Sequence, residues 1–109
     1  MEVLAELYQV RWFVDPERVG SLTEIPAEIR RNYTQNNSKL VLDDPVIQGA
    51  VKEALGGESN PYWMAWKINR HIQEKMRYEL VGGWNVAPTV LSRGSGSCSE
   101  YTFVMLAMC

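Results

Sequence analysis

The chain has 109 residues, of which 46% are apolar and 22% are charged, so it can form one domain with a buried core. Its 13 Asp and Glu outnumber its 11 Lys and Arg, and this acidic balance argues against a nucleic-acid or membrane-surface binder. The first residues include Glu2 and Glu6 and lack the basic start of a signal peptide, and no apolar run approaches the roughly 20 residues of a membrane span.

Residues 1–43 are predicted to form a strand and a loop region that precede the core. Between residues 3 and 14, aromatic and β-branched side chains alternate with polar ones, which is typical of a strand. The side chains on one side of this strand are Tyr8, Val10, Trp12 and Val14. The rest of the region is rich in Pro, Gly and Asn, and we expect only a turn or two of helix at residues 25–33.

Residues 44–109 are predicted to form the helical part of a domain. Asp44-Pro45 has the sequence of an N-cap and first helical residue, and Gly56-Gly57 has that of a helix end. Asn60-Pro61 repeats the start signal, and the apolar side chains that follow at helical spacing predict a second helix to about Tyr78.

The last segment is a glycine-rich loop that leads into an apolar helix. Ser97 and Glu100 have the spacing of a capping box, which makes Cys98 the first residue of that helix. Unpaired backbone N–H groups and the positive end of the helix dipole favour a thiolate there. Cys98 is therefore a candidate nucleophile, and the alternative is a small cysteine buried in the core.

Cys109 is the second cysteine, eleven residues after Cys98 in the same predicted helix. This separation puts the two thiols roughly 16 Å apart, whereas a disulfide needs Cα atoms within about 7 Å. We therefore expect no disulfide. Two thiols and one histidine, His71, are too few for a metal cluster, and the glycine-rich loop completes no cofactor motif, so no cofactor is expected.

The segment Gly94-Ser-Gly-Ser-Cys-Ser-Glu-Tyr101, followed by an apolar helix, resembles the nucleophile segment of the transglutaminase-like superfamily. The resemblance covers residues 45–109, in which a helix from Pro61, a stretch at 88–93 that we expect to be extended, and the Cys98 helix follow the order of the bacterial members. It implies an α+β, papain-like core, here mainly helical with an N-terminal strand and without its catalytic sheet. It also implies that Cys98 is the nucleophile of a Cys-His-Asp triad.

The triad histidine and aspartate of this family follow the cysteine, whereas His71 precedes it within a helix. We therefore predict that His71 is an ordinary helix residue and that this chain, which lacks the triad histidine and aspartate, is an inactive N-terminal fragment of the domain. Such a fragment would expose the apolar side chains of its last helix, and a homodimer would cover them. These side chains are Tyr101, Val104, Met105 and Met108.

Trp84 is a second candidate site residue, in a segment at 80–91 that we expect to be extended. Transglutaminases use a tryptophan N–H upstream of the nucleophile to stabilise the oxyanion, and Leu80–Asn85 resembles that segment with a shorter connection to Cys98. The alternative is that Trp84 covers the core at a glycine bend.

The leading prediction is a transglutaminase-like cysteine enzyme that acts on amide bonds of a protein or peptide through a thioester at Cys98. A peptidase is favoured over an amine transferase because most bacterial relatives resemble hydrolases. Two alternatives stay open: a catalytically silent transglutaminase-like interaction module, and an unrelated helical binding domain with a buried Cys98. The compartment also stays open, since relatives often lie outside the cytoplasm.

Overall fold

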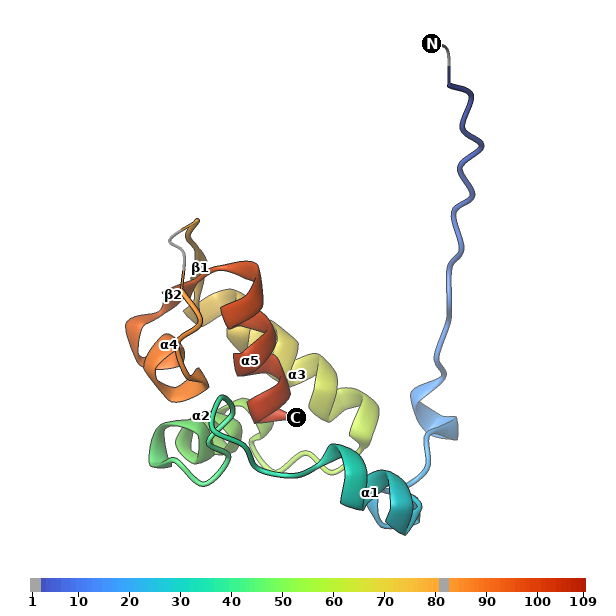
Figure 1. The fold of residues 1–109 in the computed structure, drawn as a ribbon. Coiled ribbons are helices and arrows are strands. Elements are labelled where there is room, and N and C mark those ends of the chain that lie inside the picture. The colour runs from blue at the N-terminus through green and yellow to red at the C-terminus, as the bar shows by residue number, and fades with distance from the viewer. Residues whose placement is uncertain (1–2, 81–82) are drawn as a thin grey trace.

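The computed structural model describes residues 3–80 and 83–109. Figure 1 shows four helices, α2 to α5, gathered into one body, while the N-terminal segment runs away from it. In chain order the elements are η1 (Pro16–Arg18), η2 (Leu22–Glu24), α1 (Ala27–Tyr33), α2 (Pro45–Leu55), α3 (Pro61–Lys75), β1 (Arg77–Tyr78), α4 (Ala87–Arg93), β2 (Ser95–Gly96) and α5 (Cys98–Met108). The mostly helical α+β class predicted from the sequence is therefore confirmed at this coarse level.

The starts of α2 and α3 and the end of α2 follow the predicted capping signals. The Asp44 side chain accepts a hydrogen bond from the Val46 amide, and the Asn60 side chain accepts one from the Tyr62 amide. Gly56 ends α2 in the left-handed conformation, with φ of 56°. Among the described residues, none of these helices has the length and apolarity that a bilayer crossing requires.

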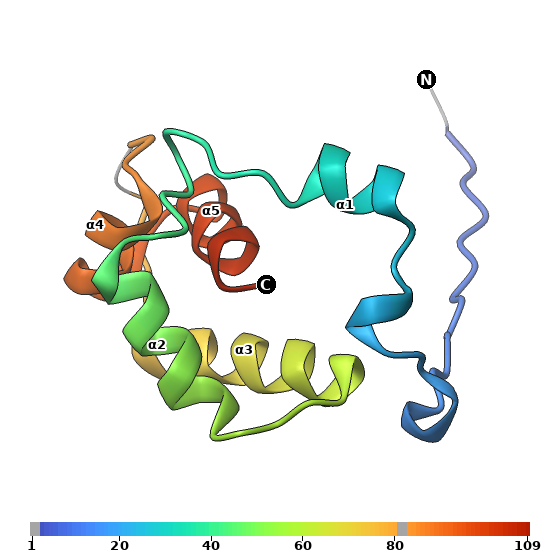
Figure 2. The same cartoon turned by 90° about the horizontal axis from the view of Figure 1, so that it is seen from below.

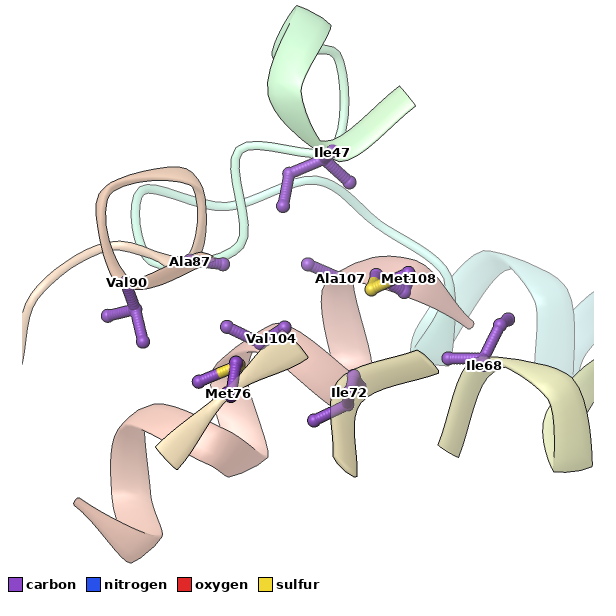
Figure 3. Close-up of a cluster of buried hydrophobic side chains, with 9 residues drawn as sticks. All are labelled: Ile47, Ile68, Ile72, Met76, Ala87, Val90, Val104, Ala107 and Met108. Carbon is purple, nitrogen blue, oxygen red and sulfur yellow. The ribbon is translucent and has the colours of Figure 1, made fainter. Parts of the chain in front are cut away.

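The core is one cluster of apolar side chains in which α5 packs against α2, α3 and α4 (Figure 3). Its buried members are Ile47, Ile68, Ile72, Met76, Ala87, Val90, Val104, Ala107 and Met108. The prediction that the apolar side chains of the last helix lack cover is therefore wrong for Val104 and Met108. Tyr101 and Met105 are half-buried, and Leu106 is the large apolar side chain of α5 that is exposed, at 56%.

The predicted N-terminal strand is wrong, although residues 3–14 are extended. No strand is assigned there, and the side chain of Trp12 is 87% exposed. Alternating side chains fit an extended backbone, but a strand also needs a neighbouring strand to take its N–H and C=O groups. The described residues contain only β1 and β2, which pair with each other. Met1 and Glu2, part of the predicted region 1–43, lie outside the described residues.

The predicted extended stretch at 88–93 is also wrong, because these residues belong to α4. Pro88 stands in the first turn, where its missing N–H removes no helical hydrogen bond, and Gly94 ends the helix with φ of 68°. Val81 and Gly82, within the segment predicted to be extended, lie outside the described residues.

A short parallel pair, β1 with β2, fixes the loop that precedes Cys98 against the end of α3. The Arg77 amide donates to the Gly94 carbonyl at 2.9 Å, and the Glu79 amide donates to the Gly96 carbonyl at 3.0 Å. The loop therefore takes its position from α3 as well as from α4.

The region before α2 contacts the body at the start of α3. The side-chain amide of Asn60 donates to the Pro16 carbonyl at 2.9 Å, and Figure 2 shows the blue N-terminal region on the side of the body where α3 begins. This contact joins residues 44 positions apart in the chain.

Candidate functional site

Cys98 is the first residue of α5 and is exposed, as the capping signal predicts. The backbone N–H groups of a first helical turn have no intrahelical acceptor, and their partial positive charge stabilises a thiolate. The alternative of a Cys98 buried in the core is wrong, because its side chain is open to solvent. An incoming electrophile can therefore reach the thiol.

Glu100 lies in the first turn of α5 and is fully buried, at 0% exposed. The predicted capping box is present, with the Ser97 amide donating to Glu100 Oε2 at 3.0 Å. The same carboxylate also accepts from Asn85 Nδ2 at 2.7 Å on Oε1 and from Arg93 Nη2 at 2.9 Å on Oε2. Its two oxygens are therefore bound by donors from two different parts of the chain.

These hydrogen bonds lower the pKa of Glu100 from 4.5 to about 2. The bond from the Ser97 amide lowers it most, the bond from the Asn85 side chain follows, and the Arg93 guanidinium adds a smaller Coulombic effect. Burial opposes this shift, because a charged carboxylate loses solvation. Glu100 is therefore an anion at neutral pH and carries no proton that it could donate to a substrate.

Trp84 is 69% exposed, and its ring packs edge-on against Phe103 with centroids 5.8 Å apart. Phe103 follows Cys98 by five residues, which turns its side chain about 140° around the helix from that of Cys98. The Trp84 indole therefore packs on a different face of α5 from the one that carries the Cys98 side chain. Trp84 is also next to Asn85 in the chain, so its backbone lies beside the hydrogen bonds of Glu100.

His71 is half-buried on α3 and lines a hollow together with Glu53 and Lys75. Those two side chains form an ion pair of 3.0 Å between Lys75 Nζ and Glu53 Oε1. The structure therefore places the histidine of this chain beside Glu53 and Lys75, in a hollow that Cys98 does not line.

Cys109 follows α5 at its far end, and both cysteines carry free thiols. Partial burial raises the pKa of the Cys109 thiol. The two thiols of the chain therefore stand in different surroundings, one at the head of a helix and the other at its end.

An open groove of about 400 Å³ lies between α3 and α5, and its first lining residues on α5 follow Cys98 by one helical turn. The hydroxyl of Thr102, which lines it, donates to the Cys98 carbonyl at 2.9 Å. The other lining residues are Asn69, Ile72, Gln73, Tyr101, Met105 and Leu106.

Sequence reasoning identified Ser97, Cys98 and Glu100 but missed Asn85 and Arg93 as partners of Glu100. The acidic residue in the first turn of an apolar helix was the available signal, because a buried carboxylate needs several donors. Which residues donate hydrogen bonds to the Glu100 carboxylate depends on how α4 packs against α5. The sequence pattern does not show how these two helices pack.

In the part of the chain that the structure describes, no group of three or more His, Cys, Asp or Glu side chains is arranged to hold a metal ion. No protein-family model, curated protein or solved structure matches this chain.

Proposed function

We propose that this chain carries the nucleophile segment of a transglutaminase-like cysteine enzyme, with Cys98 attacking an amide carbonyl of a protein or peptide. The observation that carries the proposal is the exposed Cys98 at the first residue of α5, directly after a glycine-containing loop held by β2. The papain-like arrangement belongs to the same proposal and is supported by the resemblance of Gly94–Tyr101 to the family's nucleophile segment.

In the proposed reaction the Cys98 thiolate adds to the carbonyl carbon, and the C–N bond breaks as the amine leaves with a proton. The product is a thioester, which water opens in a peptidase and an amine opens in a transferase. The resemblance favours water. Backbone N–H groups in the first turn of α5 are available to stabilise the oxyanion. The resemblance gives Trp84 as the second candidate donor, and its indole would have to leave Phe103 to reach an oxyanion at Cys98.

The reaction needs a base for the thiol and an acid for the leaving amine, and His71 lies in a hollow with Glu53 and Lys75 that Cys98 does not line. The resemblance implies a histidine and an aspartate after the nucleophile, and no histidine follows Cys98 in this sequence. We therefore expect this chain to be acylated by an activated ester, whose leaving group needs no proton, but not to cleave amides.

The test is acylation of the full chain by p-nitrophenyl acetate at neutral pH, followed by mass spectrometry of the intact protein and its peptides. We expect one acetyl group, on Cys98, that hydroxylamine removes. Cys98→Ser should abolish the modification, whereas Cys109→Ser, the matched control, should retain it. Adding a primary amine after acylation measures how the thioester divides between water and amine.

Equal acetylation of Cys98 and Cys109, or faster acetylation of lysines, would contradict the proposal. That result would favour the second candidate, a catalytically silent interaction module. The observation on its side is that the hollow lined by His71, the one histidine of the sequence, does not include Cys98.

A further inference from the structure

We infer that Glu100 is a positioning residue, whose buried carboxylate bridges the segment that carries Trp84 to the loop that presents Cys98. This inference rests on the proposed function, because it assigns Glu100 a task within that site. We refer to the hydrogen-bonded group of Asn85, Arg93, Ser97 and Glu100 as the carboxylate bridge.

The two oxygens of Glu100 serve two different segments. Oε1 accepts from the Asn85 backbone amide at 3.3 Å and from Asn85 Nδ2 at 2.7 Å. Oε2 accepts from the Ser97 amide at 3.0 Å and from Arg93 Nη2 at 2.9 Å. A shift of the Asn85 segment therefore moves the carboxylate and changes its hydrogen bonds to the Ser97 loop, and a shift of the loop has the same effect on the Asn85 segment.

Glycines on both sides allow the backbone to close on this carboxylate. A Cβ atom at Gly83 would lie 2.9 Å from Glu100 Oε1 and 2.8 Å from Asn85 Nδ2. A Cβ atom at Gly96 would lie 3.0 Å from Glu100 Cβ and 3.1 Å from Oε2. Both distances at Gly83 are shorter than real Cβ contacts, so an added Cβ atom would have to displace the end of the Glu100 or Asn85 side chain.

Helix capping alone does not require such burial, and the same chain offers the comparison. Ser21 and Glu24 form a capping box at η2, in which the Ser21 amide donates to Glu24 Oε2 at 2.9 Å. Both residues are exposed, and no Arg or Asn side chain bonds to Glu24 in the part of the chain that is described. Glu100 therefore has donors beyond those that a capping box uses.

Arg93 explains how an anion can stand two residues from a nucleophilic thiolate. A nearby uncompensated carboxylate would disfavour a second negative charge. The Arg93 guanidinium pairs with Glu100 at 2.9 Å and also donates from Nε to the Ser95 carbonyl at 3.0 Å. The carboxylate bridge thus holds the loop without adding net negative charge beside Cys98.

The test uses Gly83→Ala in the full chain, since this substitution crowds the carboxylate from the Trp84 side and changes no charge. The matched control is Gly49→Ala, whose added Cβ meets no atom within 4 Å. Two readouts are taken on the folded protein: hydrogen exchange of the Ser97 amide by NMR, and the iodoacetamide rates of Cys98 and Cys109.

We expect the Ser97 amide to exchange about tenfold faster in Gly83→Ala, the factor for losing a hydrogen bond to a charged acceptor. Cys98 alkylation should slow about threefold to fivefold, because a loosened loop moves the thiol away from the helix N-terminus. Cys109 and the Gly49→Ala control should keep their wild-type rates. A merely structural role would instead accelerate Cys109, whose partly buried thiol becomes more accessible through unfolding.

A folded Gly83→Ala variant with an unchanged Ser97 exchange rate would overturn the inference. If that variant does not fold, Asn85→Ala removes one donor to Oε1 without adding an atom, and an unchanged Ser97 exchange rate in Asn85→Ala would overturn the inference in the same way. The two proposals fail separately, because amide exchange does not depend on thiol chemistry. A wild-type Cys98 that reacts no faster than Cys109 would refute the proposed function even if Ser97 exchange responds.

Discussion

Replacing Val104 with alanine tests whether α5, which presents Cys98, is the buried centre of the fold. Val104 is fully buried, and its helix contacts α2, α3 and α4. Removing about two methylene equivalents costs roughly 1.6 kcal/mol of transfer free energy, and the cavity left behind adds to this. The better helix propensity of alanine offsets about 0.5 kcal/mol, so the free energy of unfolding should fall by about 2 kcal/mol.

This loss is large enough to measure by thermal unfolding. An unfolding entropy of about 2.1 cal/mol/K per residue gives about 0.23 kcal/mol/K for the chain, so Tm should fall by about 9 °C. Circular dichroism at 222 nm follows the transition, with Leu106→Ala as the control on the same helix. Leu106 is exposed, and its loss should change the free energy of unfolding by less than about 0.5 kcal/mol. Equal effects of the two substitutions would refute the central burial of α5.

Three further predictions concern the site and the assembly. The wild-type chain should release no fluorophore from a peptide amide substrate, and turnover that disappears in Cys98→Ala would show that a base stands near Cys98 after all. The pKa of Glu100 is lowered to about 2, so its contribution to stability should be complete above pH 4.5 and be lost as pH falls from 4.5 toward 2. Urea unfolding at several pH values in this range should show that the free energy of unfolding falls less steeply with decreasing pH in Glu100→Gln than in the wild type. Some pH dependence should stay, because this variant keeps the lowered pKa values of Glu53 and Glu58. Since Val104 and Met108 are buried, the predicted homodimer would have to use Leu106 and the half-buried Tyr101 and Met105 of the last helix. It should appear in sedimentation velocity at micromolar concentration, and a single monomeric species at every concentration would argue against it.

Local signals in the sequence predicted the elements whose causes are local. Asp44-Pro45 and Asn60-Pro61 start helices because a side-chain oxygen and a proline satisfy the first turn without help from elsewhere. Ser97 and Glu100 are three residues apart, so their capping box could also be predicted, and with it the position of Cys98.

The errors arose where the outcome depends on distant parts of the chain. The alternation at Tyr8–Val14 describes a backbone that is extended, but pairing requires a second strand that the pattern cannot supply. The wrong prediction of an extended stretch at Ala87–Arg93 is the exception, because its cause is local: the helix start and stop signals are present there and were outweighed by the glycines before them.

The partners of Glu100 could not be predicted because they depend on distant parts of the chain. Asn85 and Glu100 are 15 residues apart, and α4 lies between them in the chain, so their contact depends on where α4 packs. Sequence spacing alone does not show that Asn85 contacts Glu100. This contact is nevertheless part of what buries the capping glutamate.

The short β1–β2 pair has a consequence for when the site can form during synthesis. Parallel strands need a crossover between them, and here α4 is that crossover, between Tyr78 and Ser95. When translation has reached Ser97, the nascent chain contains α4 but still lacks Glu100, the residue to which Asn85 and Arg93 donate hydrogen bonds. Cys98 and Glu100 are two residues apart, so the thiol and the carboxylate that holds its loop are translated almost together. The loop before Cys98 therefore gains its hydrogen bond from the Ser97 amide only after Glu100 has been added.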